Sequence, residues 1–206
     1  MKLFDFIGSA VCHQIAERSF ILGGKQLPLC ARCTGIYSGI FFTMLFFFLR
    51  KRLRGNQPYG TWGMVLGALA FLPISIDGAF SYLGFWDSTQ LSRVVTGSLA
   101  GASLAGFLLL GANFDVTGKN DQPIFQSAKE QGVLIAITLF WGLLLWCGIG
   151  NYYITSVIFS MGVILFWMNL FYLVIKNLAG TRKLQFWSFS LLGGICMILA
   201  IGVLQL

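Results

Sequence analysis

Residues 12–39 read CHQIAERSFILGGKQLPLCARCTGIYSG, and the rest of the chain is organised around this stretch. It holds three of the five cysteines, the only histidine and four charged residues, in a chain that is only 10% charged and 57% hydrophobic. A soluble domain carries about 25% charged residues. Thiols, an imidazole and arginines gathered at one place in so apolar a chain indicate a site.

After this stretch, long apolar runs alternate with polar loops. An apolar run of about 18–20 residues can cross the hydrocarbon core of a bilayer. Solid apolar runs, unlike strict alternation, exclude a β-barrel. We therefore expect an all-α, polytopic transmembrane helical bundle of about six spans. The predicted spans are about 34–49, 62–84, 93–112, 132–148, 153–175 and 184–203.

The N-terminal part, residues 1–33, is too polar to span a membrane. LFDFIGSAVCHQIAE is predicted to form a short helix at the membrane interface, ended by a turn at GGKQLP. The chain is thus predicted to be a single integral membrane domain, 1–206. It would consist of an interfacial Cys/His segment, 1–33, and a helical bundle, about 34–206.

The formal net charge of +7 reflects basic residues in the loops. Six spans place nine basic residues on one side and five on the other. By the positive-inside rule, the first side is cytoplasmic. The expected location is therefore the cell membrane, multi-pass, with the Cys/His motif and both termini on the non-cytoplasmic side. The expected partner is the lipid bilayer and not nucleic acid. The nine basic residues on the predicted cytoplasmic side are Arg50, Lys51, Arg52, Arg54, Lys119, Lys129, Lys176, Arg182 and Lys183.

Small residues indicate where helices pack. Gly35 and Gly39 form a GxxxG spacing, which permits close contact between helices. Gly97, Gly101 and Gly106 are predicted packing positions on the third span.

Two charged residues fall within predicted spans. Asp77 lies in the outward half of the second span, and Arg93 begins the third on the same face. Both are predicted to lie level with the Cys/His motif. Charges near hydrocarbon usually face a protein interior or a wet cavity. One interpretation is an Asp77–Arg93 pair that merely ties two helices together; the other is a role in a ligand or catalytic site.

The cysteines and the histidine have the chemistry of a metal site. Cys30-x-x-Cys33 can chelate one metal ion from a single helical turn, and Cys12 and His13 could complete a tetrahedral zinc-type site. Two adjacent residues that bind one metal ion are strained. In a variant of this hypothesis, therefore, only one of Cys12 and His13 binds the metal. Water or Asp77 then takes a further position.

Thiol redox chemistry is the alternative. Cys30 and Cys33 begin a helix, where backbone N–H groups stabilise a thiolate, and Arg32 lies between them. His13 would act as a base and Cys12 as a resolving thiol, with electrons passing to a quinone. A third hypothesis is a non-enzymatic scaffold stapled by a Cys12–Cys30 or Cys12–Cys33 disulfide. Cys147 and Cys196 are predicted to be inert core residues.

The chain has no GxxxxGK, no HExxH and no GxSxG next to a histidine. These absences argue against nucleotide-driven pumps, zincin proteases and Ser-His-Asp hydrolases, and a lone histidine argues against bis-histidine haem.

The motif CHQ…ERSF…G…LPLCARCTGIYSG resembles a family of prokaryotic predicted membrane proteins known only as a domain of unknown function. A second signature of that family resembles Asp77-Gly78 through Trp86 and Ser88-Thr89 to Arg93, Thr96, Gly97 and Gly101. The resemblance covers roughly residues 10–110. It implies an integral membrane protein with a Cys/His site and brings no established activity. The matching residues of the first motif are Cys12, His13, Gln14, Arg18, Ser19, Gly24, Pro28, Cys30, Arg32, Cys33, Thr34, Gly35, Tyr37 and Gly39.

The first hypothesis is thus a membrane protein with an outward-facing site for zinc or another divalent metal. Arg18, Arg32 and Arg93 would surround the ligands or face an anion. The sequence leaves open whether the protein is an enzyme, what its substrate is and whether it forms a homo-oligomer.

Overall fold

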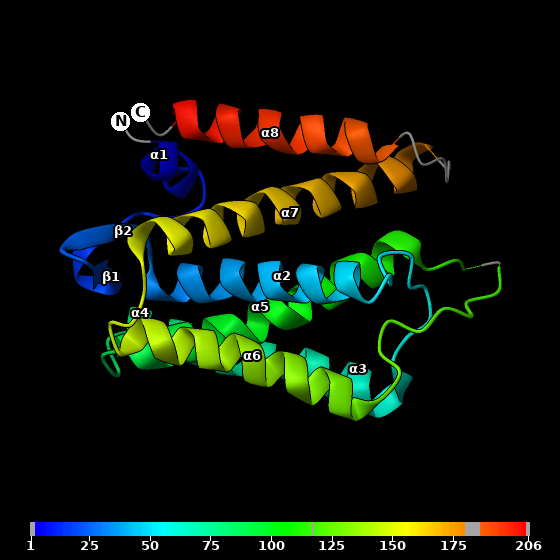
Figure 1. The fold of residues 1–206 in the computed structure, drawn as a ribbon, viewed down its shortest axis with the longest axis horizontal. Coiled ribbons are helices and arrows are strands. Elements are labelled where there is room, and N and C mark those ends of the chain that lie inside the picture. The colour runs from blue at the N-terminus through cyan, green and yellow to red at the C-terminus, as the bar shows by residue number, and fades with distance from the viewer. Residues whose placement is uncertain (1–2, 117, 180–185, 205–206) are drawn as a thin grey trace.

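The long helices of the molecule lie side by side, with their axes along its longest dimension (Figure 1). The computed structural model describes residues 3–116, 118–179 and 186–204. The predicted all-α bundle is confirmed. Its long helices are α2 (Ala31–Leu49), α3 (Gly60–Leu69), α4 (Phe71–Tyr82), α5 (Gln90–Asn113), α6 (Ala128–Trp146), α7 (Tyr152–Ala179) and α8 (Phe186–Leu204).

Five helical segments are long and apolar enough to cross a membrane, and α3 with α4 counts as one of them. The others are α2, α5, α6 and most of α7. The sixth predicted span, about 184–203, corresponds to α8, which runs antiparallel to α7 (Figure 1). Its first two residues, 184 and 185, lie outside the described residues. The apolar part of α8 that the structure describes, Ser190–Val203, is shorter than the other five.

The second span is broken at Ala70, between α3 and α4. Pro73 follows three residues later. A proline in a helix donates no backbone hydrogen bond and clashes with the carbonyl four residues earlier. That carbonyl belongs to Leu69, the last residue of α3, so Pro73 accounts for the break. The second half of the span, α4, carries Asp77.

Backbone-to-backbone contact between α2 and α5 forms the centre of the bundle. A Cβ on Gly35 would lie 2.5 Å from the Val94 carbonyl oxygen, and one on Gly39 would lie 2.7 Å from that of Ser98. From the other side, a Cβ on Gly101 would overlap the Ile36 carbonyl oxygen. The packing roles predicted for Gly35, Gly39, Gly97 and Gly101 are confirmed. A Cβ on Gly106 would meet only the Tyr59 hydroxyl, at 3.8 Å.

The N-terminal segment is folded differently from the prediction. The helix α1 covers only Leu3–Ser9, and a single 3-10 turn, η1 (Ala16–Arg18), precedes a hairpin of β1 (Ser19–Leu22) and β2 (Lys25–Cys30). Gly23 and Gly24 have φ of 57° and 74°, as a two-residue hairpin turn of right-handed twist requires. The stretch GGKQLP therefore consists of the hairpin turn and the first four residues of β2, and it does not end a helix.

The hairpin closes one end of the bundle with apolar side chains. Phe20, Leu22 and Leu27 are at most 3% exposed and pack against side chains of α2, α5, α6 and α7. Burying such a side chain stabilises a fold by roughly 1.5–3 kcal/mol. This packing fixes β2 against the start of α2 and so fixes Cys30 relative to Cys33.

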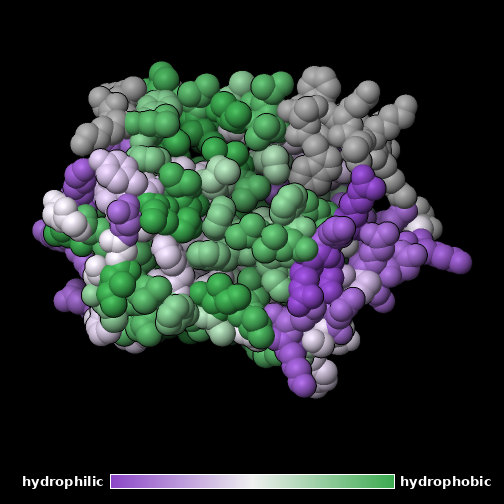
Figure 2. Space-filling model, in the orientation of Figure 1, coloured by the Kyte–Doolittle hydropathy of each residue, from purple (hydrophilic) through white to green (hydrophobic). Residues whose placement is uncertain are grey.

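The end of the bundle opposite the hairpin is rich in hydrophilic residues. Hydrophilic residues gather at the end of Figure 2 opposite the hairpin, beyond an apolar surface that covers the helices. This is where α2 ends and α6 begins, and where Arg52 bonds Glu130 at 2.6 Å. The hairpin, α1 and the starts of α2 and α5 lie at the other end (Figure 1).

Candidate metal centre

Three cysteine side chains converge at the hairpin end of the bundle. The Sγ atoms of Cys12, Cys30 and Cys33 all lie within 4.8 Å of one another. Cys12 follows α1, Cys30 ends β2 and Cys33 lies in the first turn of α2. All three are free thiols in this structure. The predicted convergence of these three residues therefore takes place.

Close contact between α1 and β2 brings Cys12 to the other two cysteines. A Cβ on Gly8 would lie 2.7 Å from the Pro28 carbonyl oxygen, so only glycine allows this approach. The Cys12 N–H donates to the Gly8 carbonyl at 2.9 Å, which ends α1 with a turn. The Cys30 N–H then donates to the Cys12 sulfur at 3.4 Å. Gly8 is a positioning residue that the sequence analysis did not identify.

The backbone after His13 is strained. Gln14 has φ of +53°, a left-handed conformation that costs a residue other than glycine about 1–3 kcal/mol. Its side-chain amide donates to the Asp5 carbonyl at 2.8 Å and ties the reversal to α1. Such strain is concentrated at functional sites. No pattern in the sequence identifies Gln14 as left-handed.

The close approach of the three thiols shifts the pKa values of Cys12 and Cys30 in opposite directions. The Cys12 and Cys33 thiols, with the backbone N–H groups of Cys33 and Arg32, hold the pKa of Cys30 well below its usual range. The hydrogen bond with Cys30 and burial raise the pKa of Cys12. A thiolate is the form of cysteine that binds metals and attacks disulfides. The arrangement therefore favours the thiolate form at Cys30 over that at Cys12.

A pocket of about 140 Å³ adjoins the three cysteines. His13 is exposed and lines this pocket, but its ring nitrogens are not part of the three-thiol group. The three arginines predicted to surround the site all line the pocket. Its full lining is Val11, Cys12, His13, Gln14, Ile15, Arg18, Cys30, Arg32, Cys33 and Arg93.

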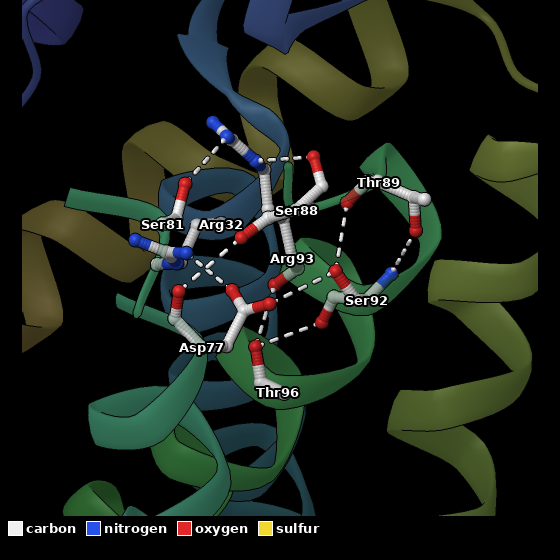
Figure 3. A network of polar contacts seen from close by, with 8 residues as sticks. All are labelled: Arg32, Asp77, Ser81, Ser88, Thr89, Ser92, Arg93 and Thr96. Atoms are coloured by element: carbon white, nitrogen blue, oxygen red, sulfur yellow. Dashed lines mark hydrogen bonds and ion pairs between the residues drawn. The ribbon is translucent and has the colours of Figure 1, made fainter. Parts of the chain in front are cut away.

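Asp77 is held in a polar network with Arg32, Ser88 and Ser92 (Figure 3). It is not part of the three-thiol group. It is 5% exposed, and its carboxylate forms an ion pair with Arg32. The Ser92 hydroxyl donates to the same carboxylate at 3.0 Å. Of the two interpretations of Asp77, the one that pairs it with Arg93 is therefore wrong, because Arg32 reaches Asp77 from the first turn of α2.

Arg93 is 7% exposed and points away from the Asp77 carboxylate (Figure 3). Its Nε donates to the Ser88 carbonyl at 3.2 Å and its Nη2 to the Ser81 hydroxyl at 3.4 Å. Ser81 was not predicted as a site residue, although a signal exists. Asp77 and Ser81 are four residues apart and share one face of α4.

The two remaining cysteines lie elsewhere. Cys147 and Cys196 are exposed on the surface of the bundle, so their predicted place in the core is wrong. Cysteine behaves as a small hydrophobe. Because lipid tails are as apolar as a protein core, a lipid-facing surface suits such a side chain equally well.

Comparison with known proteins places the chain in a family. The family model described as Predicted membrane protein (DUF2085) matches residues 12–107. An uncharacterised protein of Methanocaldococcus jannaschii is 32% identical over 101 residues, which cover 49% of this chain and 63% of that protein. An uncharacterised protein of Methanothermobacter thermautotrophicus is 37% identical over 95 residues, 46% of this chain and 81% of that protein. No solved structure matches the chain.

The matched region begins at Cys12 and ends within α5. It includes the three clustered cysteines as well as Asp77 and Arg93. The chain thus belongs to the DUF2085 family of predicted membrane proteins, as its two sequence motifs led us to expect.

Proposed function

We propose that this membrane protein binds a zinc-type divalent metal ion through Cys12, Cys30 and Cys33. The observation that carries the proposal is the convergence of three Sγ atoms within 4.8 Å of one another. Zinc–sulfur bonds of about 2.3 Å in tetrahedral geometry place sulfur atoms about 3.8 Å apart. Small rotations of the three side chains would reach that spacing.

Three protein ligands leave a fourth position for another group. His13 lines the adjoining pocket and is the residue of this chain best suited to it, with water as the alternative. Structural zinc sites are closed by four protein ligands, whereas catalytic sites keep a position for water or substrate. A water-filled fourth position would therefore favour an enzyme-like or transport role.

The charge at the two ends of the bundle supports an outward-facing site. Arg50, Lys51, Arg52 and Arg54 lie just beyond α2, at the end opposite the cysteines. By the positive-inside rule, that end faces the cytoplasm and the metal site faces the other side of the membrane.

Substitution of single cysteines tests the metal proposal. Cys12→Ser, Cys30→Ser and Cys33→Ser are each expected to lose most of the bound metal, because each removes one of three thiolate ligands. Cys147→Ser and Cys196→Ser are matched controls on exposed cysteines and should retain it. The measurement is metal content per chain by mass spectrometry on protein purified in detergent. Equal metal content in all five variants would contradict the proposal.

The second candidate is thiol–disulfide exchange, which the closeness of the same three thiols also favours. Cys30 and Cys33 would form a disulfide and release two electrons and two protons, reducing a quinone to a hydroquinone. An apolar pocket of about 190 Å³ exists, but its α2 lining begins at Phe41. That is eight residues beyond Cys33, about 12 Å along a helix. A quinone in that apolar pocket would therefore lie too far from Cys33 to react directly with the thiols.

The two candidates differ in the purified protein. Redox chemistry predicts a metal-free protein that loses two thiols reversibly on oxidation. It also predicts that either Cys30→Ser or Cys33→Ser traps a mixed disulfide. A scaffold with structural cysteines predicts neither metal nor reversible thiol loss.

A further inference from the structure

The pocket beside the thiols has more positive than negative charge. Arg18, Arg32 and Arg93 all line it. The Asp77 carboxylate is paired with Arg32. Within the part of the chain that the structure describes, no carboxylate lies at ion-pair distance from Arg18 or Arg93. Two guanidinium groups therefore face the pocket region without a carboxylate of their own.

The burial of Arg93 makes this excess of positive charge energetically unfavourable. Its side chain is more than nine-tenths buried, and its two hydrogen bonds go to neutral acceptors, a carbonyl and a hydroxyl. A guanidinium carries five N–H donors, so three remain. On the same pocket, the buried Nε of Arg32 has no hydrogen-bond partner. Buried N–H donors of a guanidinium that lack an acceptor are strongly unfavourable.

We infer that the pocket binds an oxyanion, a carboxylate or phosphate group, held by Arg93 and Arg18. The planar fork of a guanidinium matches the oxygens of both groups. The volume of about 140 Å³ accommodates a group several times larger than a water molecule, whose share of liquid volume is about 30 Å³. This inference goes beyond the metal site, because it rests on the arginines and their charge.

The oxyanion has two sources at this end of the bundle. It is either a small soluble anion or the headgroup of an anionic phospholipid at the membrane interface. Three probes separate them: inorganic phosphate, succinate, and short-chain phosphatidylglycerol. Short-chain phosphatidylcholine, with the same tails and no net charge, is the lipid control.

Binding is measured in an uncharged detergent by native mass spectrometry and by the rise in unfolding temperature with probe concentration. At least one probe should bind the unmodified protein. Arg93→Gln should weaken that binding at least about tenfold, because charge-assisted hydrogen bonds to an oxyanion are lost. Arg18→Gln, at an exposed position, should weaken it several-fold. Arg54→Gln, exposed at the opposite end of the bundle, removes the same charge and should have no effect.

The binding results identify the source of the oxyanion and also test whether the pocket binds one. Phosphate or succinate binding identifies a soluble anion, and phosphatidylglycerol binding alone identifies a headgroup. Absence of all binding overturns the inference, as does equal binding of phosphatidylcholine or an equal loss in Arg54→Gln. If Arg93→Gln does not fold, Arg18→Gln decides. Zinc content is measured on the same samples, so that loss of metal in Cys30→Ser with retained anion binding separates the two proposals.

Discussion

Replacing Gly101 by alanine is expected to lower the free energy of unfolding by about 3 kcal/mol or more. The added methyl group would overlap the Ile36 carbonyl oxygen of α2. That oxygen belongs to the helix backbone, which cannot rotate away as a side chain can. Helices α2 and α5 would have to separate along the whole contact that Gly35, Gly39 and Gly97 share.

Gly132→Ala is the matched control for this substitution. Gly132 lies within α6, and a Cβ there would meet no atom within 4 Å. Alanine has the higher helix propensity, so this variant should gain up to about 1 kcal/mol. The measurement is reversible unfolding of both variants in mixed micelles. Equal stability of the two variants would show that α2 and α5 do not touch as closely as described.

Replacing Asp77 by asparagine is expected to lower the free energy of unfolding by about 3 kcal/mol. The Asp77 side chain is 6% exposed and the Arg32 side chain 24% exposed, so the pair is largely shielded from water. Removing one partner of a buried pair leaves the other charge uncompensated. Here the orphaned guanidinium of Arg32 would also lie on the same pocket as those of Arg18 and Arg93.

Asp87→Asn is the control, because Asp87 is an exposed aspartate between α4 and α5. It removes the same charge from the same end of the molecule and should change stability by no more than about 0.5 kcal/mol. The two variants are compared by thermal and denaturant unfolding. If Asp87→Asn were as destabilising as Asp77→Asn, the loss would reflect net charge and not the buried pair.

The helical bundle could be predicted because its signals are local. Apolar runs identify spans by length alone, and Gly35 with Gly39 identifies a packing face without knowledge of the partner. That α5 is the partner depends on how the chain returns through the membrane, which no local pattern specifies. The hairpin is hard to predict because its two strands are only four and six residues long. The Gly23-Gly24 pair between apolar runs was the signal that indicated it.

The sequence predicts which residues form the site and at which level of the membrane they lie, but it predicts only some of the contacts between them. Cys12, Cys30 and Cys33 converge as their spacing suggested. The pairing of Asp77 with Arg93 is wrong, because Arg32 and Arg93 lie at the same level and only the packing of α2 and α4 against α5 selects between them. Gly8 contributes a close backbone approach and Gln14 a left-handed backbone conformation. A sequence pattern carries little information about either.

Zinc K-edge X-ray absorption on the purified protein tests the central claim most directly, because it reports the atoms bound to the metal. We predict one zinc ion per chain with three sulfur neighbours at about 2.3 Å. The fourth neighbour is predicted to be a nitrogen at about 2.0–2.1 Å, lost in His13→Ala, or an oxygen. A protein without bound metal, or a metal surrounded only by oxygen and nitrogen, would contradict the account.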